Sequence, residues 1–137
     1  MNKKSDLGET RLNEISKSMS FADSEEFWRL AIEASNYIPS CPDQIWELIL
    51  NNGVRSDEEI KLIVATCLLE HLLEFNFMGF FPKLRFAVLV EKIQLSETFL
   101  LCWKYGQSEE PQNSAQWDKL VDEIERTRKL SIEVDSQ

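Results

Sequence analysis

The chain has 137 residues, with 24 acidic and 15 basic side chains and a formal net charge of −9. This length suits one domain with a sizeable core, and a hydrophobic share of 43% excludes global disorder. An acidic surface disfavours contact with nucleic-acid phosphates or anionic lipid. It suits a basic partner, but many soluble proteins are acidic without such a partner. Only four Gly and four Pro argue against a turn-dense all-β fold.

Two helices are predicted near the N-terminus. Residues 1–8 are polar and are expected to be loosely held, and a short helix follows over 9–19. The next helix is predicted over 24–37, because Asp23 can cap its first turn and Pro39 ends it. Both segments carry apolar residues at helical spacing, so each is expected to bury one face.

A third helix is predicted over 42–51. Ser40 is a candidate for its N-cap, Pro42 is tolerated in a first turn, and Gly53 follows the last turn. Only a few residues connect this helix to the next one. Such a short connection predicts that the two helices pack antiparallel or nearly so.

The segment 56–78 is predicted to be the central helix. Ser56 and Glu59 form a capping-box pattern at its start. Behind that start, apolar residues follow a helical period at Ile60, Ile63, Val64, Cys67, Leu68, Leu72 and Phe75. Further apolar residues fill much of a second face, at Leu62, Ala65, Leu69 and Leu73. A helix that is apolar on nearly all sides is expected to be buried among the others.

The C-terminal half is predicted to hold three more helices. Gly79 is interpreted as a stop, and the helices are expected over 82–93, 96–105 and 115–130, with a polar loop over 107–113 and fraying over 131–137. No period-2 pattern is visible. Residues 1–137 are therefore predicted to form a single all-α domain, either an antiparallel bundle or a short HEAT-like stack of about six helices.

Few residues suit catalysis or metal binding. His71 is the only histidine, and Cys67 lies one turn before it. These two could supply ligands from one helix face, with Glu74 or Cys102 as a third, but no second Cys/His pair completes a zinc site. His71 is expected to lie in the core or at its boundary, bonded to a neighbour. No nucleophile, phosphate-loop or zinc motif is present, so neither an enzyme nor a cofactor is predicted.

The chain is predicted to be cytosolic. The three cysteines have no CxxC spacing, which is typical of a reducing compartment. The N-terminus lacks the apolar stretch of a secretory signal, and no apolar run is long enough to span a bilayer.

Acidic and aromatic residues are the strongest candidates for contacting a partner. Glu70 and Glu74 lie one turn apart on the central helix. They are interpreted either as a polar strip on a mostly buried helix or as a strip that meets a cation of a partner. Most other acidic clusters stand at predicted helix N-termini, where they have a local structural purpose. Core packing is expected for most of the four tryptophans, with one or two as interface anchors.

Two segments carry a resemblance to known proteins. The sequence LEHLL at Leu69–Leu73 and the pattern L-x-x-x-x-L-L-C-W-K at Leu95–Lys104 resemble a family of small helical bacterial proteins. The short acidic chain as a whole resembles immunity proteins of bacterial toxin systems, such as contact-dependent growth inhibition. That resemblance implies a non-catalytic helical protein that binds a toxin domain, often a basic nuclease, and blocks its active site.

The leading hypothesis is therefore an immunity or inhibitor protein that covers the cationic site of a cognate nuclease toxin. A monomer or a 1:1 heterodimer with the toxin is expected, without direct contact to nucleic acid or membrane. The alternative is a helical adaptor that binds a peptide or helix of a partner in a groove. The residues predicted to bind the partner are Glu70, Glu74, Glu109, Glu110, Asp57 and Glu58.

Overall fold

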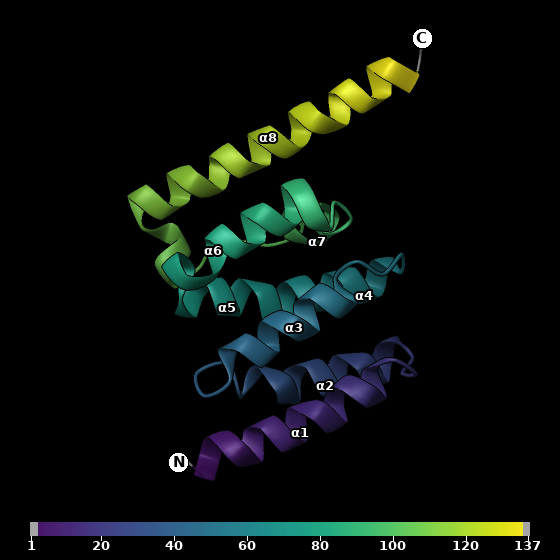
Figure 1. Cartoon of the computed structure of the whole chain (residues 1–137), viewed down its shortest axis with the longest axis vertical. Coiled ribbons are helices and arrows are strands. Elements are labelled where there is room, and N and C mark those ends of the chain that lie inside the picture. Colours follow the sequence, from purple (N-terminus) through teal and green to yellow (C-terminus); the bar gives the residue numbers. More distant parts are fainter. Residues whose placement is uncertain (1–2, 136–137) are drawn as a thin grey trace.

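The computed structural model describes the backbone of residues 3–135 and the side chains of residues 7–130. The described chain is all-α, as predicted, and contains no β-strand within these residues. The chain runs back and forth across the long axis of the molecule, and its helices follow one another along that axis (Figure 1). The first helix, α1, and the last, α8, lie at opposite ends. This arrangement corresponds to the stacked alternative and not to a closed bundle.

The stack has two layers of helices. One layer contains α1 (Lys3–Met19), α3 (Pro42–Asn52), α6 (Phe77–Phe86) with its π-helical continuation η2 (Ala87–Glu91), and α8 (Pro111–Asp135). The other contains α2 (Ser24–Ser35), the central helix and α7 (Leu95–Leu100). Within the layers, α1 packs on α3, α2 packs on the start of the central helix, and that start packs on α7. Each helix therefore mainly contacts its neighbours in the stack.

The central helix is one continuous run made of three parts. An α-helical turn, α4 (Glu58–Ile63), leads into a π-helical segment, η1 (Val64–Leu69), and then into α5 (Glu70–Phe75). Its position between α2, α3 and α7 confirms that it is the buried centre of the fold. Two predictions at its ends are wrong. Asp57, and not Ser56, accepts the capping hydrogen bonds, and the helix stops at Phe75, short of Met78.

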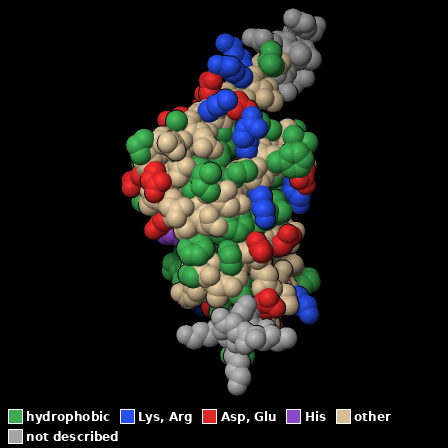
Figure 2. All heavy atoms as spheres, turned by 60° about the vertical axis from the view of Figure 1, so that its left-hand side comes forward, with side chains coloured by type: hydrophobic (Ala, Val, Ile, Leu, Met, Phe, Trp, Pro, Cys, Tyr) green, Lys and Arg blue, Asp and Glu red, His purple; other side chains and the backbone are tan. Residues whose placement is uncertain are grey.

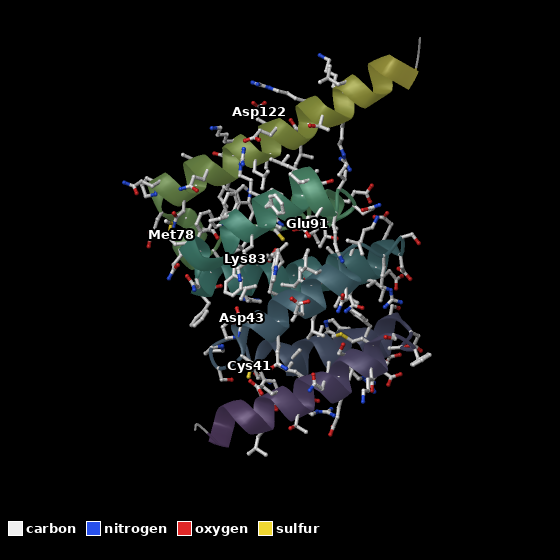
Figure 3. All side chains as sticks on the ribbon, in the orientation of Figure 1. Cys41, Asp43, Met78, Lys83, Glu91 and Asp122 are labelled. Atoms are coloured by element: carbon white, nitrogen blue, oxygen red, sulfur yellow. The ribbon has the colours of Figure 1, made fainter. Side chains whose placement is uncertain are left out.

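Polar and aromatic contacts join α3 to α6. The Trp46 and Phe80 ring centroids lie 6.3 Å apart. Lys83 Nζ lies 3.9 Å from Asp43 Oδ1, and Figure 3 labels both residues. The aromatic core continues from α6 through Phe99 of α7 to Trp117 of α8. One aromatic chain thus crosses the C-terminal half of the stack.

Several predicted helix boundaries are wrong for local reasons. α6 begins at Phe77 because the side chain of Asn76 accepts a hydrogen bond from the backbone of Gly79, so this glycine lies inside a first turn and is not a stop. The N-cap of α3 is Cys41 and not Ser40. α7 ends at Leu100, and a 3₁₀ turn, η3 (Gly106–Glu109), and the first turn of α8 occupy the predicted loop 107–113.

The outer ends of the chain are more helical than predicted. Residues 3–8 and 131–135 belong to α1 and α8 and are not irregular. The prediction for residues 1, 2, 136 and 137 falls outside the described residues. None of the described helices combines the length and the apolar character needed to cross a bilayer.

Candidate functional site

The six acidic residues predicted to bind a partner do not form one surface. Asp57 and Glu58 stand at the start of the central helix, where Asp57 caps the first turn and Glu58 pairs with Lys61. Glu74 stands in its last turn. A helix rises about 1.5 Å per residue, so Asp57 and Glu74 lie roughly 25 Å apart. On the face shown in Figure 2, acidic side chains are likewise scattered, with hydrophobic ones exposed between them.

Glu70 does not belong to the exposed acidic surface that the sequence predicts. It is only 4% exposed, and its carboxylate accepts a hydrogen bond of 2.9 Å from the backbone N–H of Trp103. Burial raises the pKa of Glu70, and this hydrogen bond opposes the rise. Its role in the structure is to fasten the segment after α7 to the central helix.

Replacement Glu70→Gln is expected to change how stability depends on pH. The folded chain holds the Glu70 proton more tightly than the unfolded chain does, because its folded pKa is raised. The stability contributed by that proton is therefore present at low pH and lost as the pH rises through the folded pKa. The side-chain amide of the Glu70→Gln variant can still accept from Trp103 and carries no charge to bury. We expect the stability of the variant relative to wild type to increase between about pH 4 and pH 7.

Urea unfolding at several pH values across this interval measures the effect. Glu47→Gln, at an exposed position of α3, is the matched control and should show no such trend. A difference between Glu70→Gln and wild type that stays constant with pH would contradict the assignment.

The segment 101–107 runs along α5 and is held at three points. Beyond the bond from Trp103 to Glu70, Gln107 Oε1 accepts from the backbone N–H of Phe77 at 2.9 Å, and Gln107 Nε2 donates to the carbonyl of Phe75 at 3.0 Å. Gly106 has a positive φ of 52°, and a Cβ there would lie 2.5 Å from Glu74 Cγ. The backbone of this segment is therefore fixed against the end of the central helix.

This fixed segment presents exposed aromatic side chains. Trp103 is 71% exposed, although its backbone N–H donates to the buried carboxylate of Glu70. Tyr105 is also exposed. The positive charge beside them is engaged, because Lys104 Nζ donates to Asp118 at 2.6 Å and to Ser114 at 2.7 Å. We name the exposed groups around this end of the central helix the acidic–aromatic surface, made of Glu74, Phe75, Trp103, Tyr105, Glu109 and Glu110.

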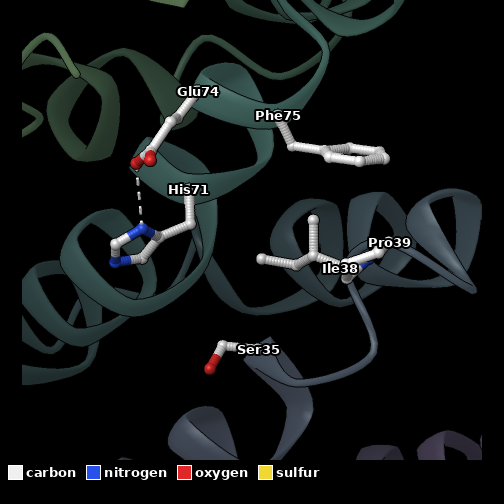
Figure 4. A pocket seen from close by; sticks show the side chains of 6 residues that line it. All are labelled: Ser35, Ile38, Pro39, His71, Glu74 and Phe75. Atoms are coloured by element: carbon white, nitrogen blue, oxygen red, sulfur yellow. Dashed lines mark hydrogen bonds and ion pairs between the residues drawn. The ribbon is translucent and has the colours of Figure 1, made fainter. Parts of the chain in front are cut away.

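A hollow adjoins this surface on the side of α2. It has a volume of about 500 Å³, and we call it the α2–α5 pocket; it is lined by Ser35, Ile38, Pro39, His71, Glu74 and Phe75 (Figure 4). His71 Nδ1 lies 3.4 Å from Glu74 Oε2. His71 is exposed, so the prediction that it lies in the core or at its boundary is wrong. The neighbour that it contacts is Glu74.

The described side chains include neither a metal-binding group nor an activated thiol. Among residues 7–130, no three His, Cys, Asp or Glu side chains are grouped so that they could hold a metal ion. Cys67 is half-buried, and burial raises the pKa of its thiol, which disfavours the thiolate that a nucleophile or ligand needs. What remains at the surface is one carboxylate–imidazole pair beside exposed aromatic rings.

The sequence predicts a helix through Tyr105 and therefore does not identify Trp103 and Tyr105 as part of an exposed segment after α7. Gly106 is consistent with a helix that ends at Tyr105, but α7 ends at Leu100, and the local pattern contains no stop there. Of the four tryptophans, Trp46 and Trp117 are buried as expected, whereas Trp28 and Trp103 are exposed. Comparison of the chain with protein-family models, curated proteins and solved structures finds no match.

Proposed function

We propose that this protein is a non-catalytic inhibitor of the immunity type, which binds a basic partner protein through its acidic–aromatic surface. The partner class proposed is a cognate nuclease toxin domain whose cationic active site the surface covers. The single observation that carries the proposal is Trp103, a large aromatic side chain that is 71% exposed on a backbone tied to the buried Glu70.

An exposed tryptophan on a fixed backbone is well suited to anchor an interface. Tryptophan is among the residues most enriched at positions that dominate binding energy. A segment that is already ordered loses little conformational entropy when it binds, so more of the contact energy appears as affinity. The bonds to Glu70, Phe75 and Phe77 supply that order.

Charge supports the choice of a basic partner. The chain carries a net charge of −9, and the acidic–aromatic surface includes the exposed Glu74, Glu109 and Glu110. Complementary charge increases the rate of encounter and selects against acidic partners, and its effect falls as salt rises. Asp57 and Glu58 at the far end of the central helix add to this long-range attraction without contacting the same partner surface.

The proposal is tested by calorimetric titration with the protein encoded by the adjacent gene, at low and at high salt. We expect tight binding that weakens with salt. Trp103→Ala should weaken the affinity for the partner by about tenfold or more, and a tenfold loss corresponds to about 1.4 kcal/mol. Trp28→Ala is the matched control, because Trp28 is 49% exposed but lies on α2, and it should leave the affinity unchanged. No binding at either salt, or equal losses in both variants, would refute the proposal.

A helical adaptor is a second candidate, favoured by one observation. A groove of about 380 Å³ lies between η2, α7 and α8, and its walls include the apolar residues Val88, Leu89, Ile93 and Ile124. A groove between helices can receive the apolar face of a partner helix. Binding there would depend little on salt and would not respond to Trp103→Ala.

A further inference from the structure

We propose that the α2–α5 pocket receives the side chain of an arginine from the partner, with Glu74 as the acceptor of the guanidinium and Phe75 as the surface on which it stacks. This inference rests on the proposed function and gives that surface a specific point of recognition. It assigns a ligand class to a pocket that shares Glu74 and Phe75 with the acidic–aromatic surface.

Glu74 provides an anionic acceptor that stays accessible. Its side chain is 45% exposed, and its contact with His71 is long at 3.4 Å. The carboxylate can therefore accept further hydrogen bonds from a donor that enters the pocket. Burial is the main cause of the raised pKa of Glu70, one turn earlier, and the charge of Glu74 raises that pKa further. The accessible negative charge at this end of the helix is therefore that of Glu74, since burial disfavours the charged form of Glu70.

The opposite wall suits the flat and apolar parts of an arginine. Figure 4 shows the Phe75 ring on the side of the hollow away from Glu74 and His71, with Ile38 and Pro39 on the same side. The planar guanidinium stacks well on an aromatic ring, and its methylene stem can cover an aliphatic surface. An acceptor on one wall and a ring on the other thus match the two recognition features of arginine.

Other occupants fit the pocket less well. None of its six lining residues is Lys or Arg, so an anion would meet Glu74 with no permanent cation to compensate it. An apolar side chain would remove water from the Glu74 carboxylate without replacing its hydrogen bonds, which is costly. A lysine ammonium would satisfy the carboxylate, but it lacks the planar face that the Phe75 ring offers a partner.

The first experiment is an NMR titration with N-acetyl-arginine-N-methylamide as the probe, and with the norleucine analogue as the matched neutral probe. We expect saturable shifts confined to backbone signals around His71, Glu74 and Phe75 for the arginine probe alone. Glu74→Gln should abolish them, and Glu47→Gln should not. Diffuse shifts, no saturable shifts, or shifts that persist in Glu74→Gln would overturn the pocket assignment.

The second experiment places the same variants in the titration with the adjacent-gene protein. Glu74→Gln and Phe75→Ala should each weaken binding about tenfold, with Glu47→Gln unchanged. If Trp103→Ala weakens binding but these two variants do not, the pocket assignment fails while the proposed function stands. If the arginine probe saturates the pocket but the protein partner does not bind, the proposed function fails and the pocket remains a guanidinium site. Backbone NMR spectra of each variant establish that it is folded.

Discussion

Replacement Phe99→Ala is expected to lower the free energy of unfolding by about 3–5 kcal/mol, the usual cost of removing a large aromatic side chain from a core. Phe99 is fully buried in α7, and its ring centroid lies 6.4 Å from that of Phe81 and 4.9 Å from that of Trp117. Its removal interrupts the aromatic contacts that join α6, α7 and α8. Rings on three separate helices cannot close a cavity of this size without moving the helices.

Urea unfolding followed by circular dichroism measures this loss. The matched control is Phe86→Ala, since Phe86 is an aromatic residue of α6 that is 53% exposed. We expect the control to change stability by less than about 1 kcal/mol, as is usual for exposed positions. Equal losses in the two variants would show that Phe99 does not have the core role assigned to it.

Replacement Gly53→Ala is expected to destabilise the fold toward the upper end of the roughly 1–3 kcal/mol typical of overpacking. Gly53 follows α3 at a point where α7 approaches closely. An added Cβ would lie 2.6 Å from Leu95 Cδ1 and 2.7 Å from the carbonyl oxygen of Ile49. The Thr98 hydroxyl also donates to the carbonyl of Gly53, so displacing this turn strains a second contact with α7.

The same unfolding experiment tests this steric argument against a nearby exposed position. Ser56→Ala removes the hydroxyl that the sequence pattern favours as a cap, yet Asp57 accepts the capping bonds in the structure. We expect Ser56→Ala to change stability by less than about 0.5 kcal/mol. A large loss in Ser56→Ala, or none in Gly53→Ala, would contradict this account of the turn.

Local sequence patterns predict the N-cap residue of one helix correctly and that of another wrongly. The pattern before α2 predicts Asp23 as the cap, and its side chain does accept from the Glu26 N–H. At the central helix, Ser56 and Asp57 are adjacent and both suit a cap by residue type. The choice between them depends on the path of the chain leaving α3, which the local pattern does not contain.

The burial pattern of the central helix explains a second difference from prediction. The sequence predicts a regular α-helix, but the residues that are fully buried recur every four positions, at Ile60, Val64, Leu68 and Leu72 and again at Ala65, Leu69 and Leu73. Four residues of an α-helix overshoot one turn by about 40°, so such rows drift around the helix. The π-helical turns of η1 contain more residues per turn than an α-helix, which reduces the rotation per residue and opposes this drift. The two rows of buried residues therefore stay directed at the core.

The candidate site depended on contacts between distant parts of the sequence. Glu70 and Glu74 belong to one predicted strip, yet only Glu74 is exposed. What buries Glu70 is the segment after α7, whose Trp103 N–H supplies its partner from 33 residues away. Periodicity within one helix indicates which face is apolar, but not which polar side chain a later segment will cover.

The stacked order of the helices has a kinetic consequence. Because helices that touch are mostly consecutive or one helix apart in the chain, most native contacts close short loops, and the relative contact order of the fold is low. Helical domains of this kind fold in microseconds to milliseconds. The last contacts to form should be those that join non-consecutive helices, such as α7 with the start of the central helix. The segment 101–107, which carries Trp103, follows directly after α7. We therefore expect it to pack against the central helix late in folding.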